Sequence, residues 1–361
     1  MITREEIDRV LQRYDKDKIT VGTLGSHSAL NIFKGAKEEG LRTVCVCTPR
    51  NEIIYRKFPL ADHVIIVENF TQLLDEKIQE KLQRLNTILI PHGSFTAYLN
   101  TEQLMSNLYV PMFGNRQLLD WEANREKQRE WLLKAGLKLP RIFRTPREID
   151  GWVIAKFPGA RGGRGYFLAS SYESFERKVA AMLSRGLVTE ADIEKIHLQE
   201  YIIGVNVYPH YFHSIIENEV ELLGVDRRYE SSIDNLGRIP AQEQLENEIT
   251  PSYTIIGNIP LTLRESLLAT LLEMGDKVVE TAKRLAYPGI IGPFCLETAI
   301  TENLEIYTFE ISARIVAGTN VGIGTSPYAY LKYGGKMYMG RRIAMEIKSA
   351  IEQERINDIV T

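Results

Sequence analysis

A predicted β-hairpin between residues 292 and 315 constrains this chain more than any other stretch. Its sequence, GPFCLETAITENLEIYTFEISARI, predicts two strands joined by a tight turn at residues 302–304. Apolar and polar side chains alternate along the second strand, as they do in a strand with one buried face. The apolar positions are Tyr307, Phe309, Ile311, Ala313 and Ile315. One face of the hairpin is therefore expected to pack on a core, and the other to be polar.

The polar face of this hairpin carries two glutamates that are predicted to oppose each other. A hairpin symmetric about the Asn303–Leu304 bond pairs Glu297 with Glu310, with their Cβ atoms roughly 5 Å apart. Facing carboxylates repel, and one of them holds a proton unless a cation lies between them. A site with few protein oxygens suits Mg²⁺, which keeps waters and binds phosphates. We therefore predict a magnesium site here, with Arg314 as an adjoining fixed charge. The alternative is a solvated hairpin with scattered charges.

The first 120 residues or so alternate predicted strands and helices, which indicates a doubly wound parallel sheet. Such sheets bind ligands beyond the carboxyl ends of their strands. Two of these ends carry loops with similar chemistry, Gly25-Ser26-His27-Ser28 and His92-Gly93-Ser94. Backbone N–H groups, hydroxyls and an imidazole suit a phosphorylated small molecule. The alternative for each loop is an ordinary helix cap made by Ser28 or Ser94.

Composition excludes several classes of protein. The 361 residues allow two or three domains, and a net charge of −3 gives no overall electrostatic attraction for nucleic acid. No apolar run approaches the roughly 18 residues of a membrane span, and the first residues do not resemble a signal peptide, so a cytoplasmic protein is expected. Cys45 and Cys47 lack further zinc ligands and are expected to be buried free thiols.

A second candidate phosphate site follows Lys156, which lies on a predicted strand. The loop after it, PGARGGRG, contains Gly162 and Gly163, and glycines allow backbone to approach a phosphate closely. The loop is not a Walker A motif, because the lysine precedes the glycines. We favour a loop that covers phosphates over a flexible basic hairpin tip. A glycine-rich stretch after residue 315 is expected either to close over a ligand or to be a long exposed connection.

The order of these parts resembles the ATP-grasp family. The shared features are the lysine strand, the glycine loop, a QEYIIG hinge, a long helix and the GPFCLE/FEISAR hairpin. The resemblance implies that Lys156 and the loop with Gly162 and Gly163 bind ATP phosphates, and that Glu297 and Glu310 bind Mg²⁺, with Mn²⁺ as an alternative. It also implies that the hinge binds adenine, through Gln199, Glu200, Tyr201 and Ile202.

The chain departs from that family pattern at two positions. Ser312 stands where an asparagine is usual, two residues after the second glutamate. Asn206 stands where an acid commonly contacts the ribose, and Glu230 is expected to take over that role.

A closer resemblance covers residues from about 15 onward. TLGSHSAL, PHGSF, KFPGARGGRGYF, QEYIIGVNVYPHYF and FEISARIVAGTN are similar to the formate-dependent 5-formaminoimidazole-4-carboxamide ribonucleotide synthetases of archaeal purine biosynthesis. In that family ATP phosphorylates formate, and the amine of the ribotide attacks the formyl phosphate without folate. The resemblance implies ribotide contacts at His27, Ser94 and Asn258, and catalytic roles for Arg314 and Lys156.

The resemblance also implies a two-domain organisation and a homo-oligomer, with a hexamer expected. We expect an α/β protein in which an N-terminal doubly wound parallel sheet, residues 1–123, precedes an ATP-grasp domain of two lobes, residues 124–361. The small nucleotide-covering lobe is expected at about 145–203. Two alternatives stay open: another ATP-grasp carboxylate–amine ligase, and a nucleotide-binding regulator without chemistry. The retained Lys156, Glu297 and Glu310 argue against the regulator, because they are groups that act on a transferring phosphoryl.

Overall fold

The computed structural model describes residues 1–161, 164–246, 254–324 and 326–361. Gly162 and Gly163, expected to cover phosphates, lie outside the described residues. Within the described ranges no helix is both long and apolar enough to cross a membrane.

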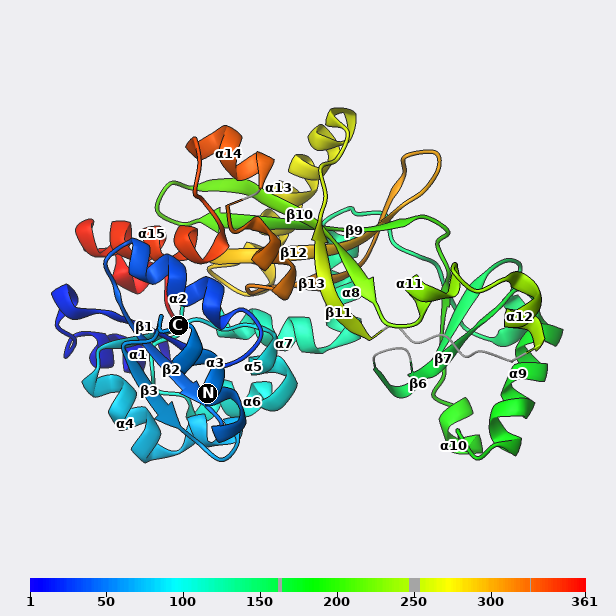
Figure 1. Cartoon of the computed structure of the whole chain (residues 1–361), viewed down its shortest axis with the longest axis horizontal. Coiled ribbons are helices and arrows are strands. Elements are labelled where there is room, and N and C mark those ends of the chain that lie inside the picture. Colours follow the sequence, from blue (N-terminus) through cyan, green and yellow to red (C-terminus); the bar gives the residue numbers. More distant parts are fainter. Residues whose placement is uncertain (162–163, 247–253, 325) are drawn as a thin grey trace.

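The N-terminal region is a parallel four-stranded sheet in the order β3-β2-β1-β4 (Figure 1). The expected doubly wound sheet is confirmed. Its strands are β1 Thr20–Leu24, β2 Arg42–Cys47, β3 His63–Ile66 and β4 Thr87–Leu89. Its helices are α1 Arg4–Leu11, α2 Ala29–Glu38, α3 Pro49–Lys57, α4 Glu76–Arg84, α5 Gly93–Tyr98, α6 Thr101–Asn107 and α7 Arg116–Ala123, with 3₁₀ turns η1 Lys16–Lys18 and η2 Phe70–Leu74. Cys45 and Cys47 are buried and free, as expected.

The helix α15, Met339–Glu352, returns from the end of the chain to pack on α2 (Figure 1). Two glycines permit this close crossing. A Cβ on Gly35 would lie 2.2 Å from the backbone nitrogen of Arg341, and a Cβ on Gly340 would lie 2.1 Å from the carbonyl oxygen of Asn31. The Asn31 side chain completes the contact, since its Oδ1 accepts the Gly340 N–H at 2.8 Å.

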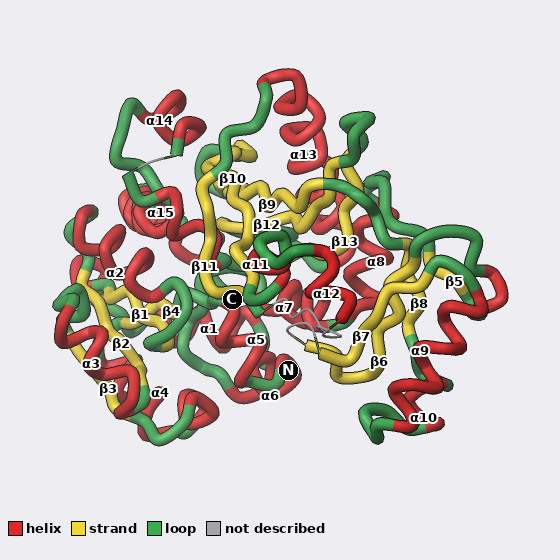
Figure 2. Tube along the Cα trace, turned by 45° about the vertical axis from the view of Figure 1, so that its right-hand side comes forward, coloured by secondary structure: helices red, strands yellow, loops and turns green. Residues whose placement is uncertain are grey.

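A second, smaller sheet has the order β5-β8-β6-β7 and lies at the far end of the molecule (Figures 1 and 2). Its strands are β5 Ile142–Phe143, β6 Val153–Arg161, β7 Arg164–Ala169 and β8 His197–Glu200. They carry the helices α9 Tyr172–Ser184 and α10 Glu190–Ile193 and the turn η3 Pro146–Glu148. The apolar core of this lobe is separate from the other cores and is built around Val153, Phe175 and Leu198.

The third sheet is antiparallel, has the order β11-β10-β9-β12-β13, and lies between the other two (Figure 2). Its strands are β9 Val205–Ser214, β10 Glu219–Glu230, β11 Ile255–Pro260, β12 Gly292–Ile300 and β13 Ile306–Ser312. The amphipathic helix α13, Leu268–Leu285, packs on its apolar face together with α8, Arg125–Lys134. The remaining elements are α11 Ile233–Leu236, α12 Ala241–Glu246, α14 Pro327–Tyr333, η4 Glu265–Leu267, η5 Ala317–Gly322 and η6 Ile356–Asp358.

The β12–β13 hairpin has the predicted pairing at its functional end and a different one near its turn. Glu297 pairs with Glu310 and Cys295 with Ser312, which confirms the predicted register. A β-bulge then follows, because Thr298 pairs with Thr308 and leaves Phe309 as an extra residue on β13. The predicted alternation is therefore wrong before the bulge: Thr308 is buried, and Phe309 packs toward the opposite side of the sheet from Ile311.

Candidate active site

A cavity of about 230 Å³ lies where the N-terminal sheet meets the antiparallel sheet. It is lined by His27 from the first loop, by Asn258 from β11, and by Glu297, Glu310 and Arg314 from the hairpin. A backbone bridge between His92 and Ile315 joins the two regions directly. These residues lie far apart in the sequence, and we predicted some of them as metal contacts and others as ribotide contacts. All of them line the same cavity.

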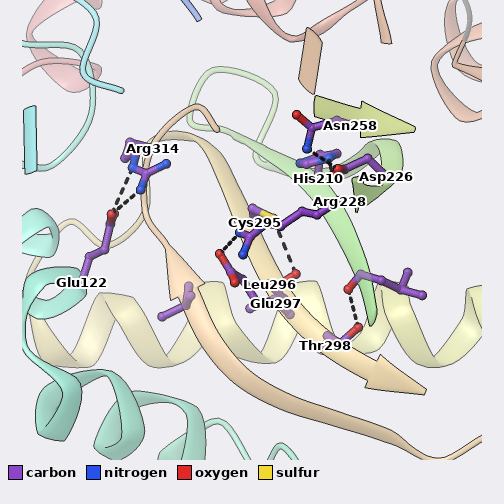
Figure 3. Close-up of polar contacts among 12 residues, drawn as sticks. Glu122, His210, Asp226, Arg228, Asn258, Cys295, Leu296, Glu297, Thr298 and Arg314 are labelled. Carbon is purple, nitrogen blue, oxygen red and sulfur yellow. Dashed lines mark hydrogen bonds and ion pairs between the residues drawn. The ribbon is translucent and has the colours of Figure 1, made fainter. Parts of the chain in front are cut away.

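The facing carboxylates differ in their surroundings. Glu297 is only 4% exposed, and its Oε1 forms an ion pair with the Arg228 guanidinium (Figure 3). Glu310 is exposed to the cavity, and the neighbouring charge of Glu297 raises its pKa above the ordinary glutamate range. This mutual repulsion is what a cation between the two carboxylates relieves, so the pair fits a Mg²⁺ ion that takes its other ligands from phosphates and water.

Arg228 is a site residue that the sequence analysis did not identify. Its guanidinium lies over the Tyr208 ring, 4.1 Å from the centroid, while it also contacts Glu297. Arg228 and Tyr208 both line the cavity. The signal was present in the sequence, because Arg228 is two residues before Glu230 on the same strand, and alternation places both on one face.

Arg314 is held from the N-terminal region by a residue that was also missed. Its Nε donates to Oε1 of Glu122 at 3.0 Å, and its Nη2 lies 2.8 Å from the same oxygen (Figure 3). Oε2 of Glu122 accepts the Ala313 N–H at 2.8 Å. Glu122, on α7, is 6% exposed. No local motif marks it, since its role arises from packing between segments far apart in the sequence.

The two N-terminal loops meet at a pair of stacked histidines. The rings of His27 and His92 are parallel, with centroids 5.2 Å apart. His92 donates from Nε2 to the Leu24 carbonyl and accepts the Ser94 N–H at Nδ1, so its ring is neutral. Desolvation, together with the adjacent His92, lowers the pKa of His27 far below its usual value. The site therefore presents an uncharged His27 to an incoming ligand.

Neither Ser28 nor Ser94 caps a helix as the alternative expected, although the second loop does have a cap, because His92 accepts the Ser94 N–H at the start of α5. Ser28 precedes α2, but its side chain makes no capping bond and instead lies 2.8 Å from His27 Nδ1. Ser94 is inside α5, and its hydroxyl donates to Ser26 Oγ at 2.9 Å. Ser94 is buried beside the cavity rather than lining it.

The predicted nucleotide contacts do not line this cavity: Lys156, Gln199 and Glu200 lie on the smaller sheet, Tyr201 and Ile202 follow it, and Glu230 lies on the antiparallel sheet. Lys156 Nζ donates to Gln199 Oε1 at 3.1 Å, and burial lowers the pKa of Lys156. Tyr201 and Ile202 line a separate hollow, as does Glu200, whose carboxylate accepts the backbone N–H of Arg141 at 2.9 Å. Glu230 ends β10, and burial raises its pKa.

Comparisons with known proteins agree with this arrangement. Two family models match: "Protein of unknown function (DUF1246)" over residues 21–143 and "Domain of unknown function (DUF1297)" over residues 174–361. A curated 5-formaminoimidazole-4-carboxamide-1-(beta)-D-ribofuranosyl 5'-monophosphate synthetase from Archaeoglobus fulgidus is 52% identical over 357 residues, covering 99% of each chain. This chain belongs to that synthetase family. The family resemblance deduced from the sequence is confirmed.

Solved structures place the synthetase family within a wider fold group. The IMP biosynthesis protein PurP from Thermococcus kodakaraensis matches with a TM-score of 0.74 and 32% identity, covering 94% of this chain and 100% of that one. N5-carboxyaminoimidazole synthetase from Staphylococcus aureus, solved with ADP, matches with a TM-score of 0.56 at 16% identity, covering 85% and 74%. The second likeness concerns the fold alone. The expected ATP-grasp architecture is confirmed.

Proposed function

We propose that this synthetase-family chain is an ATP- and formate-dependent ligase. It formylates 5-aminoimidazole-4-carboxamide ribonucleotide to the 5-formamido product through formyl phosphate, in the biosynthesis of IMP. The observation that carries the proposal is the shared cavity, because it brings two expected ribotide contacts, His27 and Asn258, to the facing pair Glu297 and Glu310. A ligase needs this proximity, since the acyl phosphate must meet the amine before water reaches it.

The residues divide between the two half-reactions. Lys156 and the hinge residues Gln199 to Ile202 bind ATP, with Glu230 at the ribose, and the loop containing Gly162 and Gly163 covers the phosphates. Arg314 stabilises the charge that develops on the transferring phosphoryl group. Glu297 and Glu310 bind Mg²⁺, or Mn²⁺, which when bound neutralises phosphate charge.

The ribotide is bound by groups from both sides of the cavity. His27 and Ser94 bind the monophosphate, where α2 also begins, and its N–H groups favour an anion. Asn258, on β11, binds the imidazole carboxamide end. The cavity walls orient the amine toward the carbon of the formyl phosphate and keep bulk water away, so that attack is faster than hydrolysis.

A phosphate-release assay over a small matrix of carboxylates and amino-ribotides tests the proposal. We expect ADP and phosphate to form only with formate and 5-aminoimidazole-4-carboxamide ribonucleotide together, or much faster than with any other pair. Comparable turnover with a different carboxylate and amine would assign the chain to another ATP-grasp ligase reaction. Absence of ATP turnover with every pair would contradict a ligase.

Three further features of the protein are proposed from family likeness. We infer a homo-oligomer, with a hexamer expected, acting on small molecules in the cytoplasm. We also infer the division into residues 1–123 and 124–361, with the covering lobe at about 145–203. Light scattering of the purified protein measures the oligomeric state, and a monomer would contradict it.

A further inference from the structure

A buried histidine–aspartate pair forms part of the cavity wall. His210 on β9 and Asp226 on β10 line the same cavity as the facing glutamates, and their exposed fractions are 2% and 1%. His210 Nε2 lies 2.6 Å from Asp226 Oδ1. The other oxygen, Oδ2, accepts a hydrogen bond from Asn258 Nδ2 at 2.6 Å (Figure 3). One carboxylate thus anchors both the histidine and an expected ribotide contact.

The carboxylate determines which nitrogen of His210 carries the proton. A carboxylate oxygen accepts, so a proton lies on Nε2, and Nδ1 is the nitrogen that can offer a lone pair. Among the described residues Nδ1 has no hydrogen-bond partner, although it is buried. Buried polar atoms in native proteins are nearly always paired, so an unpaired one at a cavity indicates a group that a ligand completes.

The backbone of η5 closes over this pair. A Cβ on Gly318 would lie 2.8 Å from His210 Cε1 and 2.3 Å from Asp226 Oδ1, so only glycine allows this approach. Gly318 also lines the cavity. The backbone of η5 therefore covers the pair and limits the access of bulk water to it.

We propose that His210 Nδ1 accepts the proton that the ribotide amine loses during formyl transfer, and that Asp226 is its positioning residue. This inference rests on the proposed function. The amine nitrogen forms a bond to the formyl carbon, and the bond between that carbon and the bridging phosphate oxygen breaks. The electron pair leaves with the phosphate, and one N–H proton moves to Nδ1. Asp226 stabilises the resulting imidazolium, which later returns the proton to phosphate or water.

The shared anchor explains why Asn258 belongs to the same arrangement. Asp226 holds Asn258 and His210 in a fixed relation, so a ribotide bound by Asn258 meets a base whose position is already set. General bases act only when they reach the proton in the bound complex, and their effect is about 10²–10⁴-fold. The phosphorylation of formate by ATP does not need this base, because formate reacts as an anion.

The decisive experiment separates the two half-reactions in a His210→Gln variant. Glutamine keeps an N–H donor toward Asp226 and removes the nitrogen that corresponds to Nδ1. Formyl phosphate formation is measured by trapping with hydroxylamine, which attacks acyl phosphates without a catalytic base. Amine transfer is measured as formylated ribotide. Ribotide affinity is measured by titration. We expect trapping and affinity within about threefold of wild type, with product formation lower by about 10²–10⁴-fold.

Two further variants support the interpretation. Asp226→Asn donates to Nε2, moves the ring proton to Nδ1 and should impair transfer in the same selective way. Asp226→Asn also tests the proposal if His210→Gln does not fold. His213→Asn is the matched control, because His213 is a buried histidine on the same strand whose Nδ1 bonds to the Ile290 carbonyl, which asparagine can also reach. It should leave both half-reactions near wild type.

The possible outcomes are distinct. Product formation within threefold of wild type in both His210→Gln and Asp226→Asn would overturn the inference while leaving the proposed function intact. An equal fall in trapping and transfer in both variants would also overturn it, because His210 would then not act in the amine step. A wild-type protein that forms no trappable formyl group would overturn the proposed function, and this inference with it. Selective loss of transfer, with trapping retained, supports the assignment.

Discussion

Glu122 and Arg314 form a buried ion pair that joins helix α7 to the end of strand β13. The guanidinium contacts one carboxylate oxygen through Nε at 3.0 Å and Nη2 at 2.8 Å. Their side chains are 6% and 13% exposed. Arg314 therefore reaches the cavity with its orientation set by the N-terminal part of the chain. The position of Arg314 in the cavity therefore depends on how the two regions pack.

Removing Glu122 should lower stability strongly. Glu122→Ala leaves a nearly buried arginine unpaired, and we expect the free energy of unfolding to fall by about 3–5 kcal/mol. Urea denaturation measures this change. The control is Asp120→Ala on the same helix, which breaks a more exposed pair with Lys127 and should change stability by less than about 1 kcal/mol. Similar losses in the two variants would contradict a special role for the Glu122–Arg314 pair.

Glu310→Gln should abolish phosphoryl transfer without harming the fold. It removes a ligand of the expected metal, and we expect activity to fall by at least about 100-fold. In the metal-free protein it also removes the repulsion from Glu297, so the thermal midpoint at pH 7 should stay equal or rise. Retention of near-normal turnover in both Glu310→Gln and Glu297→Gln would show that the hairpin is not the metal site.

The same carboxyl should make the stability of the metal-free protein depend on pH. Glu297 raises the pKa of Glu310 in the folded state above the 4.5 of an ordinary glutamate, so the folded protein keeps a proton that the unfolded chain loses. Its contribution is present below that value and is lost as pH rises through the folded-state pKa. Thermal scans from pH 4.5 upward should show a difference between wild type and Glu310→Gln that grows with pH. A difference independent of pH would contradict this.

Ribotide binding should take up a proton at His27. Desolvation lowers the pKa of His27 in the free site, and a phosphate dianion beside the ring favours the charged form and raises that pKa. Calorimetric titrations at one pH near 7, in buffers of different ionisation enthalpy, measure the protons taken up. His27→Gln should bind the ribotide about 10–100-fold more weakly and lose this uptake, while affinity for a non-hydrolysable ATP analogue stays unchanged. Identical proton uptake in variant and wild type would place the titrating group elsewhere.

Gly93→Ala should weaken ribotide binding by displacing the His27 ring. The added Cβ would lie 2.7 Å from His27 Nε2, so the imidazole must move from its stacked position on His92. We expect ribotide affinity to fall about tenfold, the value of one good contact. Gly237→Ala is the control, because nothing lies within 4 Å of its Cβ position. Wild-type affinity in Gly93→Ala would argue against a fixed position of His27.

Local pattern predicted those features that depend on local geometry. Alternation along the hairpin was enough to pair Glu297 with Glu310, and alternating strands and helices were enough to predict the parallel sheet. The bulge at Phe309 carried no signal, since no glycine marks it. Local pattern also does not show that η2 and α4 are separate elements, which Asp75 divides with its extended backbone.

Residues that act across elements were harder to predict. His210, Asp226 and Arg228 lie on strands whose order in the sheet, β10-β9-β12, does not follow the chain. Their meeting with the hairpin depends on that topology. Glu122 reaches Arg314 across 192 positions. Local sequence pattern does not show that such side chains are neighbours. Their contacts become visible only in the folded structure.

The glycine crossing of α2 and α15 has a consequence for how the chain is made. The apolar core around the N-terminal sheet includes Ile343 and Ile347 of α15 alongside Ile32 and Phe33 of α2. During synthesis α2 emerges roughly 300 residues before the helix that packs on it, and domains otherwise tend to fold as they leave the ribosome. The nascent chain must therefore carry an exposed apolar helix face through most of translation, and this face is where a chaperone would be expected to bind.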